Sequence, residues 1–159
     1  MGRLLDPLPQ SHRGDAHLPT GEYRHAVDEK GRIAVPSRFR AQLDGGLVVA
    51  TWLDTCLAVF PLAAWEDVST KVGSLPMTDP NARLLQRRLF AGAFETELDR
   101  QGRVLLPQTL RAFAGLEAEA MVLGSRDHAE IWAPARWEDY GKALDDADAF
   151  ATAISGLGI

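Results

Sequence analysis

Two segments of the chain carry the same charged residues at the same spacing, and some of these residues could bind phosphate or base edges. Residues 28–40 read DEKGRIAVPSRFR and residues 99–111 read DRQGRVLLPQTLR, which share Asp, Gly, Arg, Pro and a final Arg. Asp with Gly three positions later is typical of a tight hairpin turn, where the carboxylate accepts backbone N–H groups and Gly takes a left-handed conformation. The turn thus accounts structurally for Asp28, Gly31, Asp99 and Gly102.

The arginine after each glycine is not required by the turn. Arg32 and Arg103 could each pair with the Asp of their own turn, or project outward to a phosphate or a base edge, and the pattern alone leaves both interpretations open. The first motif adds Lys30 and Arg38, where the second has Gln and Thr. We therefore expect the first motif to be the more basic one.

Composition limits the function classes. The chain of 159 residues has a formal net charge of −5, but residues 21–43 carry five cations against three acids and residues 138–150 carry five acids against one lysine. A single cysteine, Cys56, and four scattered histidines show no metal-ligand spacing, so we expect no metal and no cofactor. Phosphate-binding, nucleophile-elbow and zinc-protease motifs are absent from the sequence, which argues against an enzyme.

The repeat predicts how the chain is organised. We expect a flexible N-terminal extension, then two related halves joined by a helix. The predicted boundaries are 1–20 for the extension, 21–76 for the first half, 77–92 for the connecting helix and 93–159 for the second half with its C-terminal helix. The chain lacks an apolar run long enough for a signal peptide or a membrane span, so we expect a cytoplasmic protein.

Each half should contain the same elements in the same order. Turn residues and apolar patterns predict strands at 22–27, 32–35, 47–51 and 57–60, and again at 94–98, 103–106, 120–123 and 129–132. Pro36 and Pro107 are expected at the first position of short helices. Amphipathic helices are predicted from Trp65 to Val72 and from Trp137 through Ala147, and Asp79-Pro80 should start the connecting helix.

The combined pattern resembles the MraZ family. The matching residues are Gly21, His25, Asp28, Lys30, Gly31, Arg32 and Pro36, then Asp79, Pro80, Arg83, Gln86 and Arg87, and finally Asp99, Gly102, Arg103 and Glu130-Ile131-Trp132. The resemblance extends from about Gly21 to Tyr140. A duplicated Asp-x-x-x-Arg motif at this spacing is the most specific part of it.

The resemblance implies an α+β fold of two tandem AbrB-like swapped-hairpin β-barrel halves. It also implies a ring-shaped homo-oligomer that represses the bacterial division and cell-wall gene cluster by binding tandem promoter repeats in double-stranded DNA, in the cytoplasm and at the nucleoid. No membrane or small-molecule substrate is implied. By position, the DNA contacts would be Lys30, Arg32, Arg38 and Arg87, and Arg103 would be a structural or oligomer contact.

A second interpretation uses the same fold without DNA. In it, the protein is an oligomeric scaffold or a toxin-neutralising partner protein. The cluster of Lys30, Arg32 and Arg38 favours DNA binding, because a scaffold would not require these cations.

Overall fold

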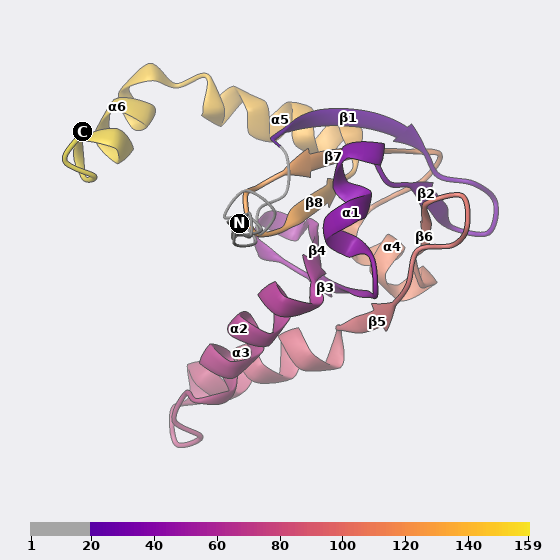
Figure 1. Cartoon of the computed structure of the whole chain (residues 1–159). Coiled ribbons are helices and arrows are strands. Elements are labelled where there is room, and N and C mark those ends of the chain that lie inside the picture. The colour runs from indigo at the N-terminus through magenta and orange to yellow at the C-terminus, as the bar shows by residue number, and fades with distance from the viewer. Residues whose placement is uncertain (1–19) are drawn as a thin grey trace, which may run out of the picture.

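The computed structural model describes residues 20–159, so the predicted extension lies outside the described residues except for Thr20. Eight strands form a six-stranded antiparallel sheet, in the order β1-β7-β8-β4-β3-β5, and a separate two-stranded ribbon of β2 and β6 (Figure 1). The strands are β1 (Gly21–Ala26), β2 (Arg32–Ala34), β3 (Leu47–Thr51), β4 (Leu57–Pro61), β5 (Phe94–Thr96), β6 (Arg103–Leu105), β7 (Glu119–Gly124) and β8 (Ala129–Trp132). The described residues thus form a mixed α+β fold with antiparallel sheets.

Six α-helices accompany the strands in the described range. They are α1 (Arg40–Leu43), α2 (Leu62–Gly73), α3 (Pro80–Ala91), α4 (Gln108–Ala114), α5 (Pro134–Leu144) and α6 (Ala147–Ser155). A short 3-10 turn, η1 (Ser37–Phe39), precedes α1. No helix among residues 20–159 has both the length and the apolar character needed to cross a membrane.

The strands of the two halves are interleaved. Strand β1 of the first half pairs with β7 of the second, and β5 of the second half pairs with β3 of the first. The ribbon joins β2 to β6, and β4 pairs with β8 at the centre of the large sheet. The hairpin predicted at each Asp-x-x-Gly-Arg turn therefore closes only at that turn, with one bridge between Val27 and Ile33 in the first half, whereas β3–β4 and β7–β8 pair within their own halves. Beyond these turns, strands β1 and β2 pair with strands of the second half, and β5 and β6 pair with strands of the first half.

The core lies between the large sheet and the ribbon. Ile33 and Val104, from the centres of the two ribbon strands, are fully buried, and they pack with Phe39 and Leu43 near α1 and with Leu110 on α4. Helices α2 and α3 contact β4 and β3, and α5 contacts β7. The central strands are thus buried on both faces, which explains why residues 47–50 and 57–60 are continuous apolar runs.

The predicted helices are present, but several of their boundaries are wrong. Helices α2 and α5 begin at Leu62 and Pro134, ahead of the predicted Trp65 and Trp137. Asp79 caps α3, because its carboxylate accepts the backbone N–H of Asn81 at 2.9 Å. Pro36 and Pro107 occupy the capping position rather than the first helical position. The predicted C-terminal helix through Ala147 is broken, because Asp146 caps a new helix by accepting the N–H groups of Asp148 and Ala149.

Candidate nucleic-acid interface

The first turn is built around the carboxylate of Asp28. One oxygen, Oδ1, accepts the backbone N–H groups of Lys30 at 3.0 Å and Arg32 at 2.8 Å. The other, Oδ2, accepts Nε of the Arg32 guanidinium at 2.6 Å. Gly31 has a φ of +85°, the left-handed conformation that the motif predicted. The predicted turn is confirmed.

The second turn repeats this geometry. Asp99 accepts the backbone N–H groups of Gln101 and Arg103, both at 2.9 Å, and Nε of Arg103 at 2.8 Å. The two turns also approach each other, with Nη1 of Arg103 3.8 Å from Oδ2 of Asp28. The backbone N–H of Arg32 and that of Arg103 are the largest causes of the lowered pKa of Asp28 and Asp99 respectively. Both carboxylates are therefore ionised at neutral pH.

The register of the ribbon places both arginines on one face. Arg32 pairs with Leu105 and Ala34 pairs with Arg103, so these four residues share a face that is opposite to buried Ile33 and Val104. This outward face is accessible, because the side chains of Arg32 and Arg103 remain 31% and 28% exposed. Each guanidinium is held by its own Asp through Nε while lying on an exposed face.

The final arginine of each motif connects the two halves. Arg111 donates Nε to the carbonyl of Leu106 at 3.0 Å and lies so close to Gly31 that a Cβ there would be 2.6 Å from Nε. In the same way, Arg40 donates to the carbonyl of Val35 and packs against Gly102. Both turn glycines are thus required twice, for their positive φ and for the close approach of an arginine from the other half.

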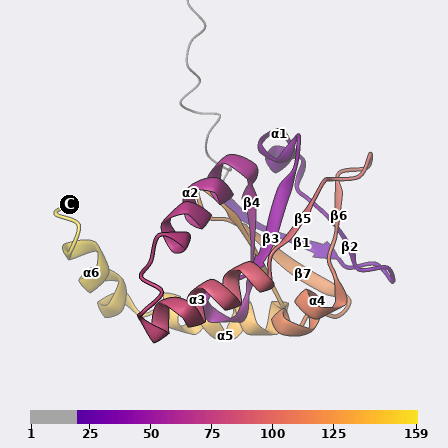
Figure 2. The same ribbon diagram turned by 90° about the horizontal axis from the view of Figure 1, so that it is seen from below.

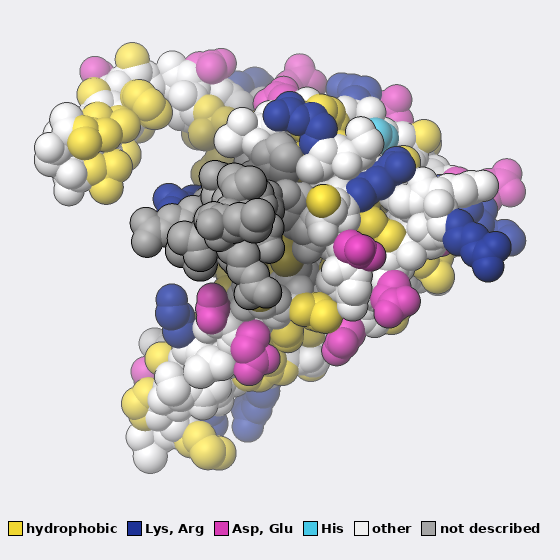
Figure 3. All heavy atoms as spheres, in the orientation of Figure 1, with side chains coloured by type: hydrophobic (Ala, Val, Ile, Leu, Met, Phe, Trp, Pro, Cys, Tyr) yellow, Lys and Arg dark blue, Asp and Glu magenta, His cyan; other side chains and the backbone are white. Residues whose placement is uncertain are grey.

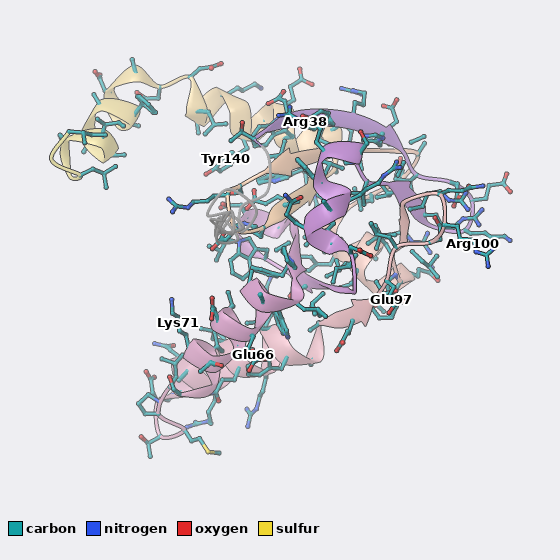
Figure 4. The ribbon with its side chains drawn as sticks, viewed as in Figure 1. Arg38, Glu66, Lys71, Glu97, Arg100 and Tyr140 are labelled. Carbon is teal, nitrogen blue, oxygen red and sulfur yellow. The ribbon has the colours of Figure 1, made fainter. Side chains whose placement is uncertain are left out.

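Arg100 is a candidate DNA contact that the comparison of the two motifs, residue by residue, did not identify. It lies at the outer end of the β5–β6 turn and points away from the body of the molecule (Figure 4). Residues 28–32 carry two acids and two bases, whereas residues 99–103 carry one acid and two bases. The second tip is therefore the more positive one. A comparison of the charges in the two motifs, instead of the shared residues, would have identified Arg100.

The basic tips lie together at one end of the molecule. Figure 3 shows Lys and Arg side chains gathered where the two turns project. Figure 2 shows the turns diverging from the ribbon at the end opposite to α6. The arrangement is a two-stranded ribbon with an arginine face, flanked by tips that carry Lys30 and Arg100.

The other two predicted DNA contacts lie away from this ribbon. Arg38, on η1, is exposed and donates Nη1 to the Tyr23 hydroxyl at 3.1 Å (Figure 4). Arg87 is exposed on α3, which lies at a distance from the tips in Figure 1. The structure thus brings Lys30, Arg32 and Arg103 to one end of the molecule, but not Arg38 and Arg87.

Two further groups with shifted pKa values lie behind the large sheet. Burial and the nearby carboxylates of Glu130 and Asp54 raise the pKa of the Cys56 thiol to about 12, so the thiol stays protonated. Burial lowers the pKa of His128, but hydrogen bonds to Glu130 and Asp127 outweigh it and the net pKa is raised. Among residues 20–159, no group of three His, Cys, Asp or Glu could hold a metal ion.

Known proteins match this chain along most of its length. The family described as "MraZ protein, putative antitoxin-like" matches twice, at residues 18–88 and 89–155. A "Transcriptional regulator MraZ" from Roseiflexus sp. (strain RS-1) is 47% identical over 138 residues, covering 86% of this chain and 96% of the relative. Those from Thermomicrobium roseum and Moorella thermoacetica are 48% and 46% identical, covering 78% and 79% of this chain and 87% and 88% of each relative. The chain belongs to the MraZ family, which consists of transcriptional regulators and not of enzymes.

Proposed function

We propose that this regulator acts by binding tandem repeats in promoter DNA through the β2–β6 ribbon and its tips, and that it represses the bacterial division and cell-wall gene cluster. It does so as a ring-shaped homo-oligomer in the cytoplasm, at the nucleoid. Each half contributes an AbrB-like swapped hairpin to a closed barrel. The proposed units are the first half at 21–76, the connecting helix at 77–92 and the second half at 93–159.

The observation that carries this proposal is the way in which the two arginines are held. An arginine has five N–H donors, and Arg32 and Arg103 each use Nε for the turn carboxylate. The terminal amino groups of Arg32 make no other hydrogen bond to the described residues and lie on the exposed face. A guanidinium fixed in this way is oriented for bidentate hydrogen bonds to guanine O6 and N7.

The shape of the ribbon suits double-stranded DNA. The major groove of B-DNA, about 12 Å wide, admits a two-stranded β-ribbon. With the ribbon in the groove, Lys30 and Arg100 at the diverging tips would meet phosphates, which position the protein without specifying sequence. Base contacts from Arg32 and phosphate contacts from the tips would then have separate roles.

A ring explains how a protein with net charge −5 can bind DNA. Several copies would gather their basic tips on one surface, while the acidic C-terminal segments lie at the opposite end of each copy (Figure 2). Tandem repeats would engage several tips at once, which raises the local concentration of each remaining tip.

The test is binding to the DNA upstream of the protein's own gene, measured by fluorescence anisotropy. We expect Arg32→Ala to weaken binding by about 5- to 150-fold per engaged copy, in line with about 1 to 3 kcal/mol for a base contact. Lys30→Gln should weaken it less and lower its salt dependence. Lys142→Gln, on the exposed face of α5, is the matched control. Melting curves verify that each variant is folded.

Wild-type affinity in folded Arg32→Ala and Lys30→Gln proteins would contradict the ribbon as the DNA-binding surface. If the wild-type protein itself failed to bind any upstream fragment, the scaffold or toxin-neutralising interpretation would replace this one.

A further inference from the structure

Helices α3 and α6 occupy equivalent places in the two halves, but only α3 is packed. Each follows an amphipathic helix, α2 or α5, and each starts at an Asp cap. Ala82 and Leu89 of α3 are 4% and 3% exposed, whereas α6 has no buried residue. In the described chain, α6 is therefore an amphipathic helix without a partner for its apolar side.

The apolar side of α6 is a stripe with helical spacing. Phe150 and Ile154 lie on α6 at i and i+4, Leu157 follows at i+7 in the turn after the helix, and Phe150 and Leu157 are 65% and 70% exposed. Figure 3 shows hydrophobic side chains along this arm, which Figure 1 shows projecting from the body. Ordinary surfaces rarely leave so continuous an apolar stripe in water.

An apolar groove lies on the other arm of the molecule. It has a volume of about 420 Å³ and lies between α2, α3 and the turn that joins β3 to β4. Its apolar walls come from Leu53, Val68, Val72, Leu85 and Leu89, and Arg88 lies at its edge. Leu85 remains 43% exposed and Leu53 71% exposed, so the groove is open to a partner.

The charges of the two arms are complementary. Helix α3 carries Arg83, Arg87 and Arg88 and no acid, whereas residues 145–159 carry Asp145, Asp146 and Asp148 and no base. Within one chain the two arms project separately from the body, with α6 at the upper left of Figure 1 and the α2–α3 pair at the lower left. Because the described α6 does not lie in this groove, the complementary surfaces can meet between different copies.

We propose that α6 of one copy docks in the α2–α3 groove of a second copy, with Phe150, Ile154 and Leu157 on its apolar walls and the aspartates beside the arginines of α3. Because each copy offers one helix and one groove, the contact is head-to-tail, and repeated contacts of this kind form a ring when the rotation between copies closes on itself. This inference rests on the ring assembly in the proposed function, but it is independent of DNA binding.

The experiment uses two variants of the full chain that each destroy one side of the contact. Phe150→Asp removes the helix side and Leu85→Asp removes the groove side, while each leaves the other side intact. By light scattering without DNA, the wild-type protein should be larger than a dimer and each variant alone should be a monomer. An equimolar mixture of the two variants should give a dimer and stop there, since only one helix and one groove remain between them.

Matched controls carry the same substitution beside each site. Leu84→Asp changes the neighbouring exposed leucine of α3, which is not part of the groove, and Thr152→Asp changes the opposite side of α6. Both should keep the wild-type size. Melting curves of all four variants verify that a loss of size is not a loss of folding.

Three results would overturn the proposal. They are a monomeric wild-type protein, a Leu85→Asp protein that keeps the wild-type size, and a mixture of the two variants that stays monomeric. Rings that assemble as expected but fail to bind DNA would contradict only the DNA-binding proposal, so the two failures can be told apart.

Discussion

The two repeats share one template but differ at both of their ends. At the turns, the first repeat carries Lys30 and the second carries Arg100 at the preceding position of the motif. At the far end, α3 has two buried residues and is followed by β5, whereas α6 has no buried residue. The shared Asp, Gly and Arg residues build the turn in both halves, whereas the differing charged residues Lys30 and Arg100 lie on exposed surfaces. Positions that differ between the repeats therefore direct attention to possible contacts with other molecules.

The largest expected difference concerns the two equivalent helices. Leu89→Ala in α3 should lower the free energy of unfolding by about 3 kcal/mol, because Leu89 is 3% exposed. Ile154→Ala in α6 should lower it by less than about 1 kcal/mol, since α6 buries no residue in its own chain. Urea unfolding at concentrations where the chain is monomeric measures both. Equal losses would mean that α6 is packed in its own chain.

Substitution of the two turn glycines by alanine should also destabilise the protein to different degrees. A Cβ at Gly31 would meet both Nε of Arg111 at 2.6 Å and the backbone carbonyl of Leu106 at 3.0 Å, whereas one at Gly102 would meet only the side chain of Arg40. We expect Gly31→Ala to cost about 2 to 3 kcal/mol and Gly102→Ala about 1 to 2 kcal/mol.

Gly45→Ala is the control for these glycine variants, because Gly45 also has a positive φ but its Cβ would meet nothing within 4 Å. It should cost about 1 kcal/mol, which is the conformational penalty alone. Thermal melting measures all three variants. A Gly45→Ala protein as unstable as Gly31→Ala would show that the close approach of the arginine contributes nothing.

The two tips can be compared by the salt dependence of DNA binding. If both repeats meet phosphates, Lys30→Gln and Arg100→Gln should each reduce the slope of log affinity against log salt by about 0.9, and the double variant by about twice that. Gln101→Lys should then have a smaller effect than either loss. Salt titrations by anisotropy give the slopes. A normal slope in Arg100→Gln, beside a reduced one in Lys30→Gln, would assign phosphate contact to the first repeat alone.

The smallest effect concerns His128, whose counterpart in the first repeat is Cys56. The pKa of His128 is raised in the folded protein, so its ion pair with Glu130 adds stability below the usual histidine pKa, and this stability is lost as pH rises through the raised pKa. His128→Gln should therefore cost about 1 kcal/mol at pH 6 and less at pH 8. Cys56→Ala should cost the same at both pH values. Urea unfolding of the two variants at each pH measures this difference.

Residue patterns predict the local features of the fold, whereas only the family resemblance, through its swapped hairpins, pointed to pairing between distant strands. Asp28 and Gly31 lie within one turn, and their residue types specify its hydrogen bonds and its positive φ. The exchange of β1 and β5 between halves depends on which strands meet, and all the short strands have similar apolar patterns. The apolar periodicity also predicted one C-terminal helix through Ala147. Periodicity does not include the capping by the Asp146 carboxylate, which accepts backbone N–H groups and starts a new helix.

The candidate site was predicted in part. The motif identified Lys30 and Arg32, but it left open whether Arg32 pairs with Asp28 or faces outward. In the structure its Nε pairs with Asp28 while its side chain lies on an exposed face, which a sequence pattern cannot distinguish. The grouping of Arg38 and Arg87 with the tips followed sequence proximity and family resemblance. Their distance from the ribbon depends on how the helices are arranged in three dimensions.

The interleaved sheet also constrains how the chain can fold during its synthesis. Gly21 pairs with Gly124, so β1 has no partner until most of the chain has left the ribosome. Contacts so distant in sequence slow folding, and an unpaired strand is exposed to wrong pairing in the meantime. The early β3–β4 hairpin, by contrast, can form as soon as residue 61 emerges. During synthesis, the β3–β4 hairpin can therefore be formed while β1 is still unpaired. A factor that binds extended segments could bind β1 in that interval.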